Sequence, residues 1–172
     1  MSPVTQFSSI ASFSKPPRLP VIHEHRRSVK WYYDVFGFKK LRNSTLNDRA
    51  LTPDAPIFST YGPTLQKVKT AYLSAGNGVG VEVFEFMDPP YQAPEGFDYV
   101  RGGIGHIGIT TPHVDEVVQK ILDNGGRQIG EQLDLGVARE GVQRTAAYLQ
   151  DPWGTVLELL MGDWVAQLAN SG

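Results

Sequence analysis

The sequence contains no cysteine among its 172 residues. This absence excludes a disulfide framework, a thiolate zinc site, a cysteine nucleophile and an iron–sulfur cluster. Any bound metal ion must therefore be held by histidine and carboxylate side chains. The chain offers 4 histidines and 18 acidic residues from which such a site can be built.

Long apolar runs and an excess of positive charge are also missing. No apolar segment approaches the roughly 20 residues that a membrane-spanning helix needs, and the N-terminal segment lacks the features of a signal peptide. Sixteen basic and 18 acidic residues give a formal net charge of −2, without the positive field typical of proteins that bind nucleic acids. With 41% hydrophobic residues the chain can still form a core. We expect a soluble, cytoplasmic protein that binds neither nucleic acid nor a membrane.

Local patterns predict a helix and a hairpin in the first half of the chain. The apolar residues of segment 28–38 have helical spacing, and Gly37 stands where a helix often ends. The segments 70–75 and 79–86 are predicted strands, because an Asn-Gly pair between two apolar runs is a strong hairpin signal.

The second half of the chain repeats this order of elements. A strand at 104–110 and a helix at 114–124 precede strands at 145–150 and 155–161, which are joined by the sequence Asp-Pro-Trp-Gly. An offset of 76 residues aligns the tripeptide Ala-Tyr-Leu at 71–73 with the one at 147–149. The repeat predicts two modules with the same order of elements.

The composition of the intervening segments suggests where the modules begin and end. We expect a loose N-terminal extension, a first module, a Pro- and Gly-rich linker, a second module and a C-terminal tail, at residues 1–16, 17–88, 89–103, 104–162 and 163–172. The segments 43–69 and 127–144 are expected to be loops.

Three polar side chains interrupt the predicted strands. The same offset of 76 aligns Glu82 with Glu158, and strand alternation places each of them on the face opposite its apolar neighbours. His106 shares its face with the small residues Gly108 and Thr110, which leave space for a ligand. Each residue alone is typical of the solvated face of a strand, but together they favour a divalent metal site.

Several motifs resemble those of a known family. The helix containing WYYDVFGF, the strands VEVFEF and GIGHIGITTP, and the closing segment AYLQDPWGTVLELL resemble the vicinal oxygen chelate superfamily over residues 17–162. This group includes glyoxalase I, fosfomycin- and bleomycin-resistance proteins and extradiol dioxygenases. The resemblance implies an α+β fold of two βαβββ modules, whose strands form a curved, cup-shaped mixed sheet with the metal inside and the helices outside.

The resemblance also implies a ligand set. In glyoxalase I-like members a residue on the first strand and a Glu on the last strand of each module hold the metal, which here gives His106, Glu158 and Glu82. The position of the fourth ligand falls on Pro17. Either residues 21–23 are the remnant of a shortened first strand and His23 is the ligand, or His23 and His25 have a capping or surface role before the helix. The surface role is favoured.

The implied activity is that of a metal-dependent lyase or isomerase acting on a small carbonyl or vicinal-oxygen substrate. One divalent ion (zinc, nickel, manganese, cobalt or iron) would stabilise an oxyanion, and Glu82 or Glu158 would be the base. The alternative is a metal-free protein that binds a small molecule, as in the bleomycin-resistance branch. An extradiol dioxygenase is less favoured, because only His106 is a well-placed histidine. The modules pair either within one chain or across a homodimer.

Overall fold

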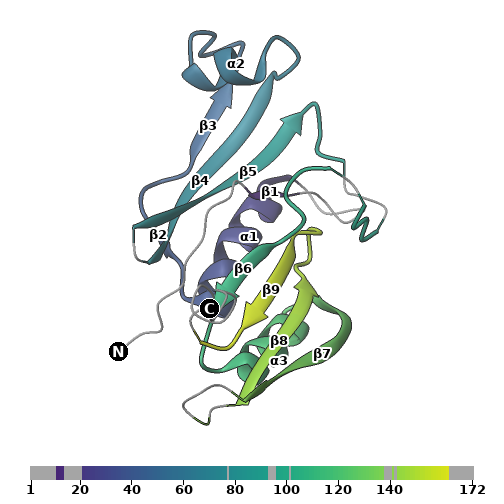
Figure 1. Cartoon of the computed structure of the whole chain (residues 1–172). Helices are drawn as coiled ribbons and strands as arrows, with labels where there is room; N and C mark the ends of the chain where they lie inside the picture. Colours follow the sequence, from purple (N-terminus) through teal and green to yellow (C-terminus); the bar gives the residue numbers. More distant parts are fainter. Residues whose placement is uncertain are drawn as a thin grey trace.

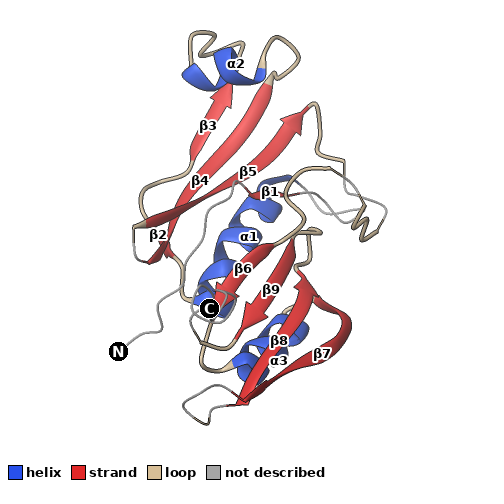
Figure 2. Cartoon of the chain, viewed as in Figure 1, coloured by secondary structure: helices blue, strands red, loops and turns tan. Residues whose placement is uncertain are grey.

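A computed structural model describes residues 11–13, 21–76, 78–92, 96–100, 102–137, 141 and 143–162. The side chains of residues 11–13 and 21–24 are not described. The chain forms two sheets with helices packed against them (Figures 1 and 2), which confirms the predicted α+β class with two sheet-forming modules. No helix in the described ranges is long and apolar enough to span a membrane.

The first module forms a five-stranded sheet with the order β1-β5-β4-β2, and β3 also pairs with β4. Its strands are β1 (Ala11–Phe13), β2 (Lys39–Lys40), β3 (Thr45–Asp48), β4 (Lys67–Gly76) and β5 (Val79–Asp88). Its helices are α1 (Val21–Phe36) and α2 (Pro56–Tyr61). α2 lies at the end of the sheet farthest from the second module (Figure 1).

The second module forms a four-stranded sheet with the order β6-β9-β8-β7. Its elements are β6 (Ile107–Thr110), α3 (Val114–Asp123), β7 (Arg127–Val137), β8 (Gln143–Gln150) and β9 (Val156–Leu160). The strand β6 runs parallel to β9, whereas the other pairs in this sheet are antiparallel.

The two predicted helices and the hairpin are confirmed. α1 ends before Gly37, which adopts a φ of 73° and donates its backbone N–H to the carbonyl of Tyr33 at 2.8 Å. This left-handed conformation is the one for which glycine is selected at a helix C-terminus. The hairpin strands β4 and β5 pair in antiparallel fashion from Lys67 to Gly76.

The expectation for the first strand is wrong. Residues 21–23 begin α1 and are not the remnant of a strand. The first strand is β1, which lies within the segment expected to be a loose extension and pairs in parallel with β5, as β6 does with β9. The segments expected to be loops also contain regular structure: β3 and α2 lie within 43–69, and β7 begins at Arg127.

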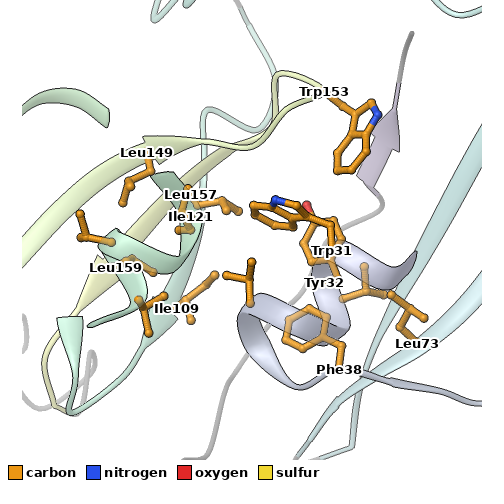
Figure 3. Close-up of a cluster of buried hydrophobic side chains, with 14 of the residues drawn as sticks. Trp31, Tyr32, Phe38, Leu73, Ile109, Ile121, Leu149, Trp153, Leu157 and Leu159 are labelled. Atoms are coloured by element: carbon orange, nitrogen blue, oxygen red, sulfur yellow. The ribbon is translucent and has the colours of Figure 1, made fainter. Parts of the chain in front are cut away.

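One hydrophobic core joins the two modules. α1 packs against β4 and β5, α3 packs against β7, β8 and β9, and the two helices contact each other. Buried side chains from both modules form one cluster, shown in Figure 3, which includes Trp31, Tyr32, Leu73, Ile121, Trp153, Leu157 and Leu159. A second, smaller cluster of Phe58, Leu65, Val68 and Phe84 belongs to the first module alone. The modules therefore pack with their helix-covered faces toward each other.

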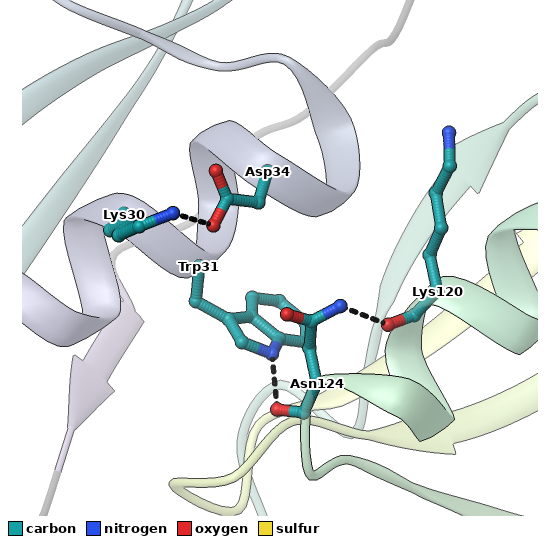
Figure 4. A network of polar contacts seen from close by, with 5 residues as sticks. All are labelled: Lys30, Trp31, Asp34, Lys120 and Asn124. Atoms are coloured by element: carbon teal, nitrogen blue, oxygen red, sulfur yellow. Dashed lines mark hydrogen bonds and ion pairs between the residues drawn. The ribbon is translucent and has the colours of Figure 1, made fainter.

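Two aromatic residues of α1 connect the modules directly. The ring of Trp31 meets that of Trp153 edge to face at a centroid distance of 6.1 Å, and its Nε1 donates to the carbonyl of Asn124 at 3.0 Å (Figure 4). The hydroxyl of Tyr32 donates to Oδ2 of Asp151 at 2.7 Å. Oδ1 of Asp151 accepts the backbone N–H groups of Trp153 and Thr155, so the Asp-Pro-Trp-Gly turn is shaped by the same carboxylate that binds α1.

We expect Trp31→Ala to lower the free energy of unfolding by about 3–5 kcal/mol, because it removes a large buried side chain and leaves a cavity between the modules. Urea denaturation measures this loss. Tyr33→Ala is the matched control on the same helix: its side chain is 60% exposed, and its loss should change stability by less than about 0.5 kcal/mol. Equal effects of the two substitutions would show that the contact between the modules does not stabilise the fold.

Candidate functional site

Glu82 and Glu158 occupy equivalent positions in the two sheets. Glu82 on β5 lies opposite Tyr72 on β4, and Glu158 on β9 lies opposite Tyr148 on β8. In each strand the neighbours of the glutamate belong to the core, so the glutamate is on the face turned away from α1 in the first sheet and from α3 in the second. The structure thus repeats a Tyr–Glu pair on the outer face of each sheet.

In the second module, His106 and Tyr148 both contact Glu158. Nε2 of His106 lies 3.2 Å from Oε2 of Glu158, and the hydroxyl of Tyr148 donates to Oε1 at 2.7 Å. The His106 ring also meets the Tyr148 ring edge to face at 5.3 Å. His106 precedes β6 and keeps 42% of its side chain exposed, whereas the side chain of Glu158 is only 12% exposed. The carboxylate is therefore held by two partners at a site that solvent reaches from the histidine side.

The environment of Tyr148 keeps its phenol protonated. Burial, the hydrogen bond to Glu158 and the charge of Glu158 raise its pKa to about 12. A phenol that stays protonated at neutral pH can only donate to the carboxylate. Tyr148 therefore fixes one oxygen of Glu158 and leaves the other directed to His106.

In the first module, aromatic side chains surround Glu82 on its face of the sheet. Phe84 and Phe86 stack at a centroid distance of 5.7 Å, and Tyr61 of α2 packs against both rings. Burial and, secondly, the charge of Glu82 raise the pKa of Tyr61. Glu82 thus lies close to an aromatic wall.

Glu82 does not join His106 and Glu158 within one chain. In the described ranges, no three histidine or carboxylate side chains form a group able to hold a metal ion. The reason is the packing of the modules: the core lies between the sheets, and the two glutamates are on the outer faces. Of the three predicted ligands, the structure brings two together, His106 and Glu158.

Sequence comparison decides the family. Residues 21–159 match the Glyoxalase/Bleomycin resistance protein/Dioxygenase superfamily. The chain belongs to this superfamily. The resemblance predicted from the sequence motifs is confirmed, while no curated protein sequence matches the chain.

Solved structures of superfamily proteins share the fold. A glyoxalase family protein from Bacillus cereus is similar with a TM-score of 0.61 and 15% identity, covering 94% of this chain and 92% of that chain. For the fosfomycin resistance protein FosX from Listeria monocytogenes the TM-score is 0.55 at 13% identity, with 93% of each chain covered. For glyoxalase I from Zea mays it is 0.52 at 22% identity, covering 88% of this chain and 43% of that chain. At these identities the similarity establishes the fold.

Strand register changes the alignment of the first strands of the two modules. Ala11 pairs with Val83 as Ile109 pairs with Leu159 in the second sheet. β1 and β6 are therefore offset by 98 residues (109 − 11), so Pro17 is not the counterpart of His106. The position that this offset gives lies outside the described residues. His23 lies in α1, and its side chain is outside the described residues.

The expectation that His25 has a surface role is wrong. Its side chain is buried, with only 2% of the residue exposed, and its Nε2 lies 2.8 Å from Oγ of Ser44. Burial, together with the charges of Lys69 and Lys40, lowers its pKa to about 4. No local sequence pattern indicates that His25 is buried, because Ser44 and the two lysines lie on other segments of the module.

Arg42, Arg139 and Arg144 are cations that could bind an anionic substrate, and the structure describes two of them. The guanidinium of Arg42 lies over the ring of Tyr72 at 4.1 Å, on the same face as Glu82. Nη2 of Arg144 donates to the carbonyl of Leu135 at 2.9 Å, and its buried Nε has no partner among the described residues. Arg139 lies outside the described residues.

Neutral His25 contributes to the stability of the fold, and we expect this contribution to disappear as the pH falls from 6.5 toward 4. Its folded pKa of about 4 lies below the ordinary value of 6.5, so in this window the unfolded chain binds a proton that the folded chain does not. The free energy of unfolding of the wild type should fall by roughly 2 kcal/mol relative to His25→Gln between pH 7 and 4.5. Subtracting the two curves cancels other groups, including Asp151, whose pKa burial raises to about 6.

Denaturation curves at several pH values measure the difference. His113→Gln is the control, because the side chain of His113 is 60% exposed. At pH 7 this substitution should change the free energy of unfolding by less than about 0.5 kcal/mol. Parallel stability curves for wild type and His25→Gln would contradict the expected linkage.

Proposed function

We propose that this protein is a metal-dependent lyase or isomerase that acts on a small carbonyl or vicinal-oxygen compound. The observation that supports the proposal most is the contact between Nε2 of His106 and Oε2 of Glu158 at 3.2 Å, on the face turned away from the core. Imidazole and carboxylate are the ligands of divalent transition metals in proteins without cysteine.

The pair of His106 and Glu158 fits two ligands of one ion. Ligand atoms at about 2.1 Å from a common metal lie roughly 3 Å apart, close to the observed 3.2 Å. Tyr148 occupies the second oxygen of Glu158, so this carboxylate would bind through one oxygen only. Glu82 does not fit the same set within one chain.

We infer that a second copy of the chain supplies Glu82. Each module presents its glutamate on the sheet face opposite α1 or α3, and α2 packs on part of this face in the first module. Two copies can therefore bring the first sheet of one against the second sheet of the other. Closed pairs of identical chains are the commonest oligomers, and such a pair would contain two equivalent sites. The structural relative FosX was solved with manganese(II), which agrees with a superfamily site for a divalent ion.

The residues of the chain then take separate roles. A bound divalent ion would supply Lewis-acid stabilisation of negative charge on a substrate oxygen. Glu82 is the base that removes the proton next to the carbonyl, because His106 and Tyr148 already restrain Glu158. Tyr148 positions Glu158, and the aromatic wall of Tyr61, Phe84 and Phe86 excludes water from the side of Glu82.

A metal-free binding protein of the same fold is the second candidate. One observation favours it: both oxygens of Glu158 already have partners in the chain, His106 and Tyr148. A carboxylate satisfied in this way does not require a cation. Metal analysis separates the two candidates.

We expect protein purified without chelators to contain about one divalent metal ion per chain. The variants His106→Ala and Glu158→Gln should each lose most of this metal, because each substitution removes a ligand. Mass spectrometric metal analysis measures the content. His113, just before α3, and Glu116, in its first turn, form an exposed pair 3.7 Å apart that offers matched controls. His113→Ala and Glu116→Gln should keep the metal; a metal-free wild type would support the binding protein.

We expect two inactive variants to restore a site when they are unfolded and refolded together. A mixed pair of Glu82→Gln and His106→Ala chains contains one site with all three ligands if the site lies between copies, so about a quarter of the wild-type metal content should return. The experiment has two readouts. The first is the metal content. The second is the exchange of C–H protons next to a carbonyl, followed by NMR in D2O with methylglyoxal and glutathione as the first substrate. Recovery of neither would place Glu82 outside the site.

A further inference from the structure

A cavity of about 240 Å³ lies on the first module, away from the proposed metal ligands. It is formed by α1, by β2 and by Ser44 before β3, whereas the pair of His106 and Glu158 belongs to the second sheet. Its volume is below that of sites for drug-sized ligands, so it suits a smaller molecule. Val29 and Phe38 contribute apolar surface to its lining.

His25 lines this cavity, and one of its two ring nitrogens is unpaired. The residue is 98% buried, being 2% exposed, and its Nδ1 has no hydrogen-bond partner among the described residues. Buried polar atoms of side chains are nearly always paired with protein or with an ordered ligand or water. The unpaired Nδ1 is therefore an independent sign that a polar atom belongs beside it.

The lining carries positive charge. Arg26, Lys30 and Lys40 all line the cavity, and no acidic side chain does so among the described residues. Lys30 pairs with Asp34 one turn later on α1 (Figure 4), which leaves the charges of Arg26 and Lys40 unbalanced within the lining. An anionic group is the ligand chemistry that these cations favour.

The contact of His25 with Ser44 has the geometry of a base and a nucleophile, but its electrostatics do not suit catalysis. Burial, with the charges of Lys69 and Lys40, holds the pKa of His25 near 4, so it is a weak base. Within the described part of the chain, no group orients the ring through Nδ1, as the base of a catalytic triad requires. The arrangement therefore fits binding and not hydrolysis.

We propose that this cavity binds a small organic anion, in which a carboxylate or phosphate group is attached to a ring or a short apolar body. The anionic group meets Arg26 and Lys40 at the rim, the apolar body lies against Val29 and Phe38, and a polar atom faces His25. The site is separate from the proposed metal centre and does not depend on the proposed activity.

The experiment measures binding of benzoate and phenyl phosphate to the full chain by calorimetry and by ¹H–¹⁵N NMR. Both anions should bind and shift the amide signals of α1 and β2, and benzyl alcohol, an uncharged analogue, should bind at least about tenfold more weakly. Raising the salt concentration from about 0.05 to 0.5 M should weaken the binding of the anions. Preference for phenyl phosphate over benzoate would identify the phosphate as the natural group, and the reverse preference the carboxylate.

Lys40→Gln and Lys39→Gln form a matched pair. The two lysines are neighbours on β2 and both are exposed, but only Lys40 lines the cavity. Lys40→Gln should weaken binding about five- to tenfold, and Lys39→Gln less than about twofold, although both remove one charge. Ser44→Ala should change the affinity for both anions. An NMR spectrum that is unchanged outside the cavity would show that the fold of this variant is intact.

Three results would overturn the proposal. The first is no binding of either anion at millimolar concentration. The second is equal binding of benzyl alcohol, and the third is equal loss in the two lysine variants, which would indicate general attraction to a positive surface. None of these outcomes bears on the metal content of the protein, so this proposal and the proposed enzyme activity can fail separately.

Discussion

The packing of α1 against the Asp-Pro-Trp-Gly turn determines how the two modules are arranged. Trp31 meets Trp153 and donates to Asn124, and Tyr32 donates to Asp151, so one helix of the first module is bound to the turn and helix end of the second. Asp151 serves both sides of this contact, because it also accepts the N–H groups that shape its own turn. The buried phenol and carboxylate satisfy each other, which is the condition for placing polar groups in a core.

This arrangement has a direct consequence for the candidate site. A core between the sheets requires the apolar face of each strand to point inward, and alternation then sends Glu82 and Glu158 outward on opposite sides. A single chain therefore carries two candidate half-sites that differ in their side chains. One has a histidine, a tyrosine and a restrained carboxylate, and the other has a carboxylate beside an aromatic wall. Neither is sufficient for the proposed chemistry, which is why we infer that two copies combine them.

The elements that the sequence predicted correctly are those specified by nearby residues. The hairpin of β4 and β5 and the end of α1 at Gly37 depend on turn and capping chemistry within a few positions. β1 was missed because three residues have no periodicity of their own, and its pairing with β5 joins segments about 70 positions apart. β7 was missed because most of its residues are exposed and because Gly130 and Gly136, both at positive φ, interrupt it. The same distinction applies to the site residues. The faces of Glu82 and Glu158 can be predicted from strand alternation within each strand. The burial of His25 cannot, because it depends on Ser44 in another segment.

The motif that most clearly carries the family resemblance is structural, not chemical. The Asp-Pro-Trp-Gly turn contributes its aspartate and tryptophan to the packing between modules, and both are buried. In this chain the turn packs the two modules together, a role that does not involve a metal, so the motif identifies the fold and cannot separate an enzyme from a binding protein. The residues that can do so are on the opposite face of the same two strands, where His106, Tyr148 and Glu158 contact one another. A histidine beside a buried, restrained carboxylate serves no purpose in packing the core, and it is this pair, more than the motif, that favours metal-dependent catalysis.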